Sequence, residues 1–298
     1  EQYQRALQVV RDVDVFIYGS CPIEYFKERV KTGKLTFLYS ERWFKRGWVN
    51  IFSPRLIQQM LFYHLHCHGK PVYLLGSGAY AAQDFHKMFA FRGKSYKWGY
   101  FTTVPTLDID AVLQVKRDDV VKILWVARFI PLKHAEKMVE LAVKLKSMGE
   151  KYVVTMVGSG SEEERIKQMA LQQGVAEYMH FTGAIPNTQV KELMKSYHIF
   201  CFTSNRLEGW GAVVNEAMGC GCCPVISIDT GAAPYLIKEG VNGFTFKLSK
   251  QDDLFEKVYW LVKHPEVREG MSLQAYTTIH DVWSPKNAAS NFFRLATS

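Results

Sequence analysis

The second half of the chain alternates short apolar runs with longer amphipathic segments, and this alternation constrains the fold more than any other feature. Segments with helical spacing, such as residues 134–149, separate the apolar runs. Strands that alternate with helices in this way are typical of a parallel sheet covered by helices on both faces. We therefore expect a doubly wound α/β domain whose strands come from five runs: 122–128, 152–158, 178–183, 198–204 and 223–228.

The first half follows the same α/β pattern on a smaller scale. Its apolar runs of strand length are residues 13–20, 34–41 and 71–77, and the stretch 97–112 is expected to link the two halves. A chain of 298 residues can form two domains with cores of their own. We expect one domain over residues 1–110, a second over 111–283 and a last helix over 284–298.

The positive charge of the chain belongs to its first half. Residues 1–105 contain 15 Lys and Arg against 7 Asp and Glu, whereas the remaining residues contain 22 of each. A basic domain joined to a neutral one indicates an anionic partner. An anionic membrane face or a lipid diphosphate fits this charge, and a merely solvated basic surface is the alternative. Nucleic acid is disfavoured, because no nucleic-acid-binding motif accompanies the basic residues.

Composition predicts a cytoplasmic protein. No run of 18 or more apolar residues is present, so we expect no membrane-spanning helix. No basic-then-apolar stretch of signal-peptide type opens the sequence. The six cysteines form no disulfide framework, and three of them cluster at residues 220–223. We expect them to be small buried residues in a reducing compartment.

Two carboxylates separated by seven residues mark the candidate site. Glu208 and Glu216 enclose Gly209, Trp210 and Gly211, between an apolar run and a stretch with helical spacing. The three enclosed residues should lie at a helix N-terminus, where unpaired N–H groups and the helix dipole favour an anion. We expect Glu208 in the preceding loop and Glu216 about two turns into the helix. Because carboxylates accept hydrogen bonds from hydroxyls, the arrangement suits a sugar joined to a diphosphate.

A cationic pair follows the first apolar run of the second half. Arg128 and Lys133 should lie in a loop at the carboxyl edge of the sheet, where ligands bind in such folds. A planar guanidinium and a mobile ammonium at this spacing can hold a diphosphate from two sides. An exposed basic loop is the alternative interpretation of the same pair.

These motifs resemble those of retaining, GT-B-fold glycosyltransferases of family 4, the glycosyl transferases group 1 type. The segment EGWGAVVNE resembles their E-x(7)-E signature, Arg128 and Lys133 resemble their R-x(4)-K pair, and NGFTF follows at residues 242–246. The resemblance covers the chain from about Val121 onward and is loose before that. It implies two Rossmann-like domains facing a cleft, with the last helix crossing back to the first domain. The opening strand and glycine-rich loop of the family are missing, so we expect an incomplete N-terminal domain.

The resemblance also implies roles for individual residues. Arg128 and Lys133 would hold the nucleotide-sugar phosphates and stabilise the leaving diphosphate, while His134 replaces the glycine that usually follows the lysine. Glu216 would accept hydrogen bonds from the donor ribose, and Glu208 would face the hydroxyls of the transferred sugar. Further donor contacts are expected at the backbone of Gly209, Trp210 and Gly211 and at Gly158, Ala184 and Ile185. Acceptor-side contacts are expected at Ser40, Glu41, Arg42 and Ser77.

The implied activity is sugar transfer from a UDP- or GDP-linked donor, with retention of anomeric configuration and without a metal. The acceptor would be a saccharide or a lipid-linked molecule in surface-polysaccharide assembly, with peripheral contact at the inner membrane face. A binding module that holds a nucleotide sugar without transferring it is the second interpretation. A nucleic-acid binder is the third, and its support in the sequence is poor.

Four other patterns have simpler interpretations. The Asp-x-Asp sequences at residues 12–14 and 108–110 are expected in turns rather than at a metal. His64, His66, Cys67 and His68 should end a helix, where histidines suit the dipole, with a metal site as the alternative. The amphipathic segment 54–66 favours a core-packing helix over one that touches membrane. Ser161 and Glu164 predict a capping box at a helix start.

Overall fold

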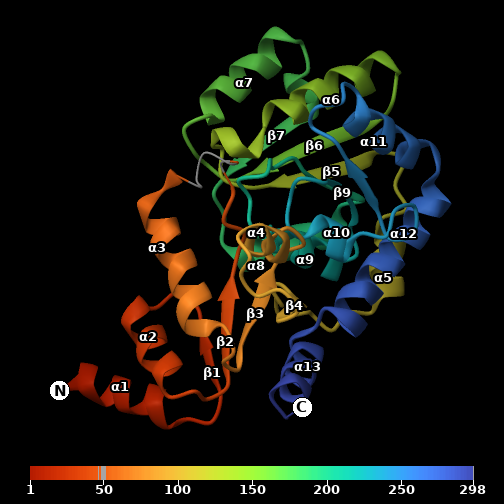
Figure 1. Ribbon diagram of the computed structural model, residues 1–298. Coiled ribbons are helices and arrows are strands. Elements are labelled where there is room, and N and C mark those ends of the chain that lie inside the picture. The colour runs from red at the N-terminus through yellow and green to blue at the C-terminus, as the bar shows by residue number, and fades with distance from the viewer. Residues whose placement is uncertain (46, 48–51, 298) are drawn as a thin grey trace. The chain divides into compact units, whose positions relative to one another are not determined.

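The structure is a computed structural model that describes residues 1–45, 47 and 52–297. It divides into two units, each with a parallel sheet of its own (Figure 1). Unit 1 comprises Glu1–Tyr100 and Ala289–Ser298, and unit 2 comprises Phe101–Ala288. The units therefore divide after residues 100 and 288, whereas the sequence placed the divisions after residues 110 and 283.

Unit 2 is built on a six-stranded sheet in the order β10-β9-β8-β5-β6-β7, and all of its neighbouring strands are parallel. The chain runs outward from β5 through β6 and β7, then returns to the other side of β5 with β8. Ligands bind outside the carboxyl ends of strands at such a switch point. The strands are β5 (Val121–Val126), β6 (Tyr152–Val157), β7 (Met179–Gly183), β8 (Ile199–Phe202), β9 (Cys223–Ser227) and β10 (Phe244–Phe246).

Side chains alternate between the two faces of the sheet along each strand, and here both faces are apolar. Helices therefore cover both faces. Ile123 and Trp125 of β5 belong to one core cluster with side chains of α6, α7 and α11, and Leu124 belongs to another with side chains of α8, α9 and α10 (Figure 1). The α-helices of unit 2 are α5 (Ile109–Val115), α6 (Glu136–Ser147), α7 (Glu163–Gln172), α8 (Asn187–Ser196), α9 (Ala212–Gly219), α10 (Ala233–Leu236), α11 (Asp253–Lys263) and α12 (Pro265–Thr277). Shorter turns are η3 (Pro131–Lys133), η4 (Ala176–Tyr178) and η5 (Thr278–Val282).

Unit 1 contains a four-stranded parallel sheet in the order β1-β2-β3-β4. The last helix contributes to this unit, since the ring of Phe292 lies 5.0 Å from Phe37 and 6.3 Å from Trp98 between ring centroids. The strands are β1 (Phe16–Tyr18), β2 (Thr36–Ser40), β3 (Val72–Ser77) and β4 (Ser95–Trp98). The helices are α1 (Gln2–Asp12), α2 (Ile23–Lys31), α3 (Pro54–Phe62), η2 (Tyr63–Cys67), α4 (Ala81–Lys87) and α13 (Pro285–Thr297), which begins in unit 2.

The structure differs from the expected elements in two places. Residues 97–112, predicted as a linker, include the end of β4 and the start of α5. Asp108 is the N-cap of α5, and its carboxylate accepts a hydrogen bond from the N–H of Ala111 at 3.1 Å. The predicted capping box is wrong: α7 begins at Glu163 with Glu162 as N-cap, and no side chain caps it. Its acidic first turn suits the helix dipole without a cap.

The expected core-packing helix over residues 54–66 is confirmed for one side of the segment, because Tyr63 is buried in the unit 1 core and Phe62 packs against it. Helix α3 has no buried residue, and Ile57, Leu61 and Leu65 of α3 and η2 remain exposed. The histidine-rich end of this segment forms η2, a π-helical turn, before Gly69. Within the described part of the chain, no helix is long and apolar enough to cross a membrane.

Candidate functional site

The loop after β5 is fastened to the loop after β8 at the carboxyl edge of the unit 2 sheet. The indole N–H of Trp125 donates to the hydroxyl of Thr203 at 2.9 Å, and that hydroxyl donates to the carbonyl of Lys133 at 2.6 Å. The N–H of Asn205 donates to the carbonyl of Leu132 at 2.9 Å. Because β5 and β8 are neighbours in the sheet, these bonds hold the two predicted site loops side by side.

Lys133 and Glu208 form an ion pair across these two loops. Their side chains are only 12% and 19% exposed, so solvent screens their interaction less than that of a surface pair. The ammonium also lies 5.0 Å from the centroid of the Phe202 ring. An ammonium has three donors, so Lys133 can bind an anion while it keeps this carboxylate. Two residues predicted to face the same ligand are thus in direct contact.

Gly211 is the N-cap of α9, at the point where the chain turns from the β8 loop into the helix. Its φ is 97°, and a Cβ there would lie 2.6 Å from the ring of Phe202, so only glycine fits. Among the described residues no side chain caps α9, and while the N–H of Val214 donates to the carbonyl of Gly211 at 2.9 Å, the N–H groups of Ala212 and Val213 are left for an anionic ligand. Trp210 has a buried ring whose N–H donates to the amide oxygen of Asn215 at 2.8 Å. Its side chain is therefore part of the unit 2 core.

Glu216 is the fifth residue of α9, which places it little more than one turn into the helix rather than two. The helix begins late because Gly211 is left-handed and ends the irregular loop. Asn187 donates to the Glu216 carboxylate at 3.1 Å, and the Lys191 ammonium lies 3.7 Å from it. Sequence reasoning missed both partners because they lie on α8, and only their positions in the first turns of a helix could have indicated them.

The side chain of Arg128 is exposed, and its guanidinium has no hydrogen-bond or ion-pair partner among the described residues. The loop after β6 passes directly against the loop after β5, which carries Arg128. A Cβ on Gly158, whose φ is 134°, would lie 1.9 Å from the carbonyl oxygen of Ala127. The N–H of Gly158 in turn donates to Gly183 at 2.9 Å, next to the exposed Ala184. The carboxyl ends of β5, β6 and β7 are thereby held together around Arg128.

His134 connects the same loops through its side chain. Its φ is 47°, a left-handed conformation that glycine adopts more readily. One ring nitrogen lies 2.8 Å from the Glu136 carboxylate, and the amide of Asn205 donates to the other at 3.0 Å. The carbonyl of Asn205 accepts from the N–H of Glu208 at 3.0 Å. His134 and Asn205 therefore support the two loops that carry Lys133 and Glu208.

The remaining predicted residues lie elsewhere. Ile185 is half-buried and packs against the α8–α9 side of the unit 2 core. In unit 1, Ser40 ends β2 and the buried Ser77 ends β3, while Glu41 accepts a hydrogen bond from a tyrosine hydroxyl. Arg42 donates to the buried carboxylate of Asp84 at 3.3 Å, so its charge stabilises the fold of unit 1.

The other candidate ligand groups do not converge. Across residues 1–45, 47 and 52–297, no three His, Cys, Asp or Glu side chains are grouped so that they could hold a metal ion. Cys220, Cys222 and Cys223 are buried, and burial raises the pKa of the Cys220 and Cys223 thiols to about 12. Cys21 is exposed, contrary to the expectation that all the cysteines are buried.

The comparison with known proteins agrees with this geometry. Residues 111–278, more than half of the chain, match the family described as Glycosyl transferases group 1, and the chain belongs to that family. An uncharacterized glycosyltransferase of Methanocaldococcus jannaschii is 24% identical over 196 residues, which are 64% of this chain and 49% of that protein. The GDP-mannose-dependent alpha-(1-6)-phosphatidylinositol monomannoside mannosyltransferase of Mycolicibacterium smegmatis is 26% identical over 167 residues, 54% of this chain and 44% of that protein.

The chain spans about half the length of these curated relatives. Among solved structures, Anabaena HepE in complex with UDP is similar with a TM-score of 0.76 and 14% identity, covering 99% of this chain and 82% of that chain. This likeness shows a shared fold, the GT-B arrangement of two parallel α/β sheets.

Proposed function

We propose that this chain transfers a sugar from a nucleoside-diphosphate sugar to a saccharide or lipid-linked acceptor. The observation that carries the proposal is the Lys133–Glu208 ion pair beside the uncapped N-terminus of α9. One small region then offers a cation, backbone N–H groups that can bind an anion, and a carboxylate that can accept hydrogen bonds from sugar hydroxyls. The relative named for GDP-mannose and the similar structure that holds UDP support a UDP- or GDP-linked donor.

The chemistry follows from where negative charge would develop. As the bond between sugar and diphosphate breaks, Arg128, Lys133 and the N-terminus of α9 would stabilise the leaving diphosphate. Glu208 would bind the hydroxyls of the transferred sugar, and Glu216 those of the donor ribose. With no residue acting as nucleophile, we propose front-side displacement, in which the leaving diphosphate accepts the acceptor's proton and anomeric configuration is retained. The Lys133 ammonium would supply charge that a metal provides in other transferases.

The acceptor would meet unit 1, with Ser40, Glu41 and Ser77 as acceptor-side residues at strand ends. The net positive charge of residues 1–105 supports contact with an anionic membrane surface, where a lipid-linked acceptor would be found. The name of the mycobacterial relative, which includes phosphatidylinositol monomannoside, supports an acceptor of this kind. Surface-polysaccharide assembly at the inner face of the membrane is the biological role that we propose.

The test is turnover of a panel of UDP- and GDP-linked sugars by the wild-type chain and two variants. Arg128→Ala removes the cation with no protein partner, and Glu216→Ala removes the proposed ribose acceptor. Because a hydrogen bond to a charged group contributes about 1.5–3 kcal/mol, each change should lower kcat/KM by about 10- to 100-fold or more. Glu192→Ala, which removes an exposed carboxylate of α8, is the matched control and should leave turnover unchanged.

Circular dichroism should show that all three variants keep the fold. Normal turnover in Arg128→Ala or Glu216→Ala would contradict the assigned roles. Tight binding of the diphosphate by the wild-type chain without any hydrolysis or transfer would instead support a binding module.

A further inference from the structure

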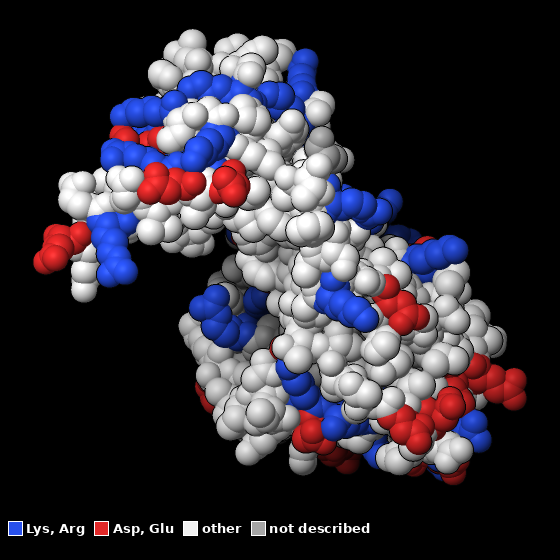
Figure 2. Space-filling model, turned by 90° about the horizontal axis from the view of Figure 1, so that it is seen from below, with Lys and Arg blue, Asp and Glu red and all other residues white. Residues whose placement is uncertain are grey.

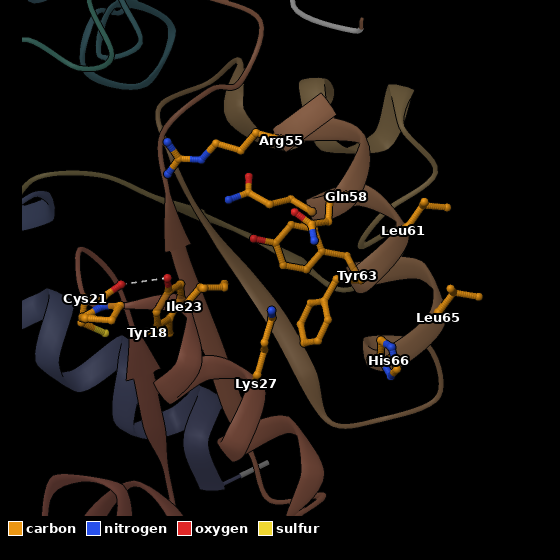
Figure 3. Close-up of a pocket in the computed structure, with 13 residues that line it drawn as sticks. Tyr18, Cys21, Ile23, Lys27, Arg55, Gln58, Leu61, Tyr63, Leu65 and His66 are labelled. Atoms are coloured by element: carbon orange, nitrogen blue, oxygen red, sulfur yellow. Dashed lines mark hydrogen bonds between the residues drawn. The ribbon is translucent and has the colours of Figure 1, made fainter. Parts of the chain in front are cut away.

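A groove in unit 1 lies between α2, α3 and the segment that follows β1, and it is lined by none of the predicted donor or acceptor residues that the structure describes (Figure 3). Its volume is about 490 Å³, which is in the range of small-ligand sites. Ile23 and Lys27 line it from the side of α2, and Arg55 and Gln58 line it from α3. The groove is therefore formed by two helices whose facing side chains leave space between them.

The charges in this groove are all of one sign. Lys27 and Arg55 approach it from opposite walls, and no described Asp or Glu side chain lines it (Figure 3). The guanidinium of Arg55 makes no hydrogen bond or ion pair with any described residue, and the Lys27 ammonium lies 6.0 Å from the centroid of the Phe62 ring. Two cations without carboxylate partners indicate an anionic ligand.

The rim of the groove is apolar and faces solvent. Leu61 and Leu65 point outward from α3 and η2 and are 48% and 70% exposed (Figure 3). Ile57, one turn earlier on the same side, is 38% exposed. An apolar ridge beside cationic side chains is typical of helices that lie in a membrane interface.

Basic side chains gather on one part of the molecular surface. Lys and Arg side chains gather on the lobe at the upper left of Figure 2, on the side where the N-terminal residues lie. This agrees with the excess of basic residues among residues 1–105. A long-range attraction to an anionic surface would thus bring the groove toward its ligand.

We infer that this groove docks an anionic phospholipid of a bilayer. The lipid phosphate lies between Lys27 and Arg55, while Leu61 and Leu65 enter the acyl region beside it. This inference rests on the membrane contact included in the proposed function and assigns that contact to named residues. It needs no nucleotide sugar, so it can be tested separately from sugar transfer.

The test is co-sedimentation with vesicles of phosphatidylglycerol and phosphatidylcholine, compared with vesicles of phosphatidylcholine alone. The wild-type chain should bind the anionic vesicles and bind the neutral ones much less. Arg55→Gln should weaken binding about fivefold, because a basic residue at an anionic surface contributes about 1 kcal/mol. Leu65→Ser should weaken it about tenfold by removing an apolar side chain from the acyl region.

Matched controls separate the groove from net charge and general hydrophobicity. Arg5→Gln removes an exposed charge of α1, and Leu171→Ser removes a 59% exposed leucine of α7 in unit 2. Both should bind anionic vesicles like the wild type. If Arg5→Gln and Arg55→Gln weakened binding to anionic vesicles equally, the net positive charge of the chain and not the groove would explain the binding, and the proposal would be overturned. Unchanged vesicle binding of Leu65→Ser together with a change in oligomeric state would overturn it in favour of a second copy of the chain.

Binding of UDP and GDP, measured by calorimetry, distinguishes this inference from the proposed function. Each variant should bind nucleotide as the wild type does, since the changes lie outside the candidate donor site. If the wild-type chain turned over nucleotide sugar but did not bind anionic vesicles, only the proposed lipid site would be overturned. A chain that binds vesicles through the groove but turns over no sugar would contradict only the transferase assignment.

Discussion

His134 has a backbone conformation that side chains rarely adopt, and its ring is held on both sides. Replacing it by alanine removes the contacts with Glu136 and Asn205 but keeps a Cβ at φ 47°. Replacing it by glycine removes the same contacts and relieves the left-handed strain, which is about 1 kcal/mol. We therefore predict that His134→Ala lowers the free energy of unfolding by about 2 kcal/mol, and His134→Gly by about 1 kcal/mol less. Urea denaturation of the two variants measures the difference.

The relative stabilities of the wild type and the two variants test this explanation. If the alanine variant were as stable as the wild type, the ring contacts would contribute nothing, and His134 would not support the site loops. If glycine were less stable than alanine, the strain argument would fail.

At the level of single residues, the sequence predicts the charged groups of the candidate site but not the groups that hold them. Lys133 and Glu208 were predicted from local motifs, and the structure brings them into contact. Thr203 and Asn205, which fasten their loops, were not predicted. Their contacts join segments about 70 residues apart, and spacing within a motif carries no information about such pairs.

The loop between β6 and α7 requires glycine at position 158. At Gly158 a Cβ would overlap the carbonyl of Ala127, and φ is 134°. Gly158→Ala must move the loop away from Arg128, so we expect a loss of several kcal/mol in the free energy of unfolding. Gly174→Ala is the matched control, because its φ of 67° is left-handed but nothing lies within 4 Å of the new Cβ.

The control should lose only about 1 kcal/mol from the left-handed conformation. Chemical denaturation of both variants gives the comparison. Similar losses would mean that the close approach of the two loops is not required for stability.

His198 joins the amino ends of β5 and β8, and it should make stability depend on pH. Its Nδ1 accepts from the N–H of Lys122 at 2.9 Å, and its Nε2 faces the carbonyl of Lys116. Burial lowers the pKa of His198 to about 4, whereas an unfolded histidine has a pKa near 6.5. Between these values the unfolded chain binds the proton and the folded chain does not. Stability should therefore fall as pH drops from 6.5 to 4, by about 3 kcal/mol.

The non-titrating variant His198→Asn provides the comparison. Its stability, measured by urea denaturation at several pH values, should fall less steeply than that of the wild type in the same window. Identical slopes would show that His198 does not remain neutral in the folded chain.

At the level of elements, apolar runs in the sequence are sufficient to predict the central strands of unit 2, because both faces of those strands are buried. They are insufficient for β4, where none of the four residues Ser95–Trp98 is fully buried, and no apolar run marks the strand. Helix α3 is predicted to pack against the core, and the structure shows this at Phe62 while Ile57 and Leu61 stay exposed. Periodicity shows that a helix has an apolar side without showing what that side meets.

For the molecule as a whole, charge and topology assign different tasks to the two units. Unit 2 has the switch point of a doubly wound sheet, and its portion of the sequence is close to neutral. Unit 1 holds most of the basic excess and the cationic groove. We accordingly assign donor binding to unit 2 and contact with acceptor and lipid to unit 1.

The central claim is that the diphosphate of the donor binds between the β5 loop and the N-terminus of α9. Amide hydrogen exchange with and without UDP or GDP locates that site directly. Uridine and guanosine, which lack the diphosphate, are the matched controls. We predict that a diphosphate slows exchange in residues 127–135 and 203–212 and that the nucleosides do so much less. Unchanged exchange in both segments, with protection at the opposite edge of the sheet around residues 113–119, would contradict the account.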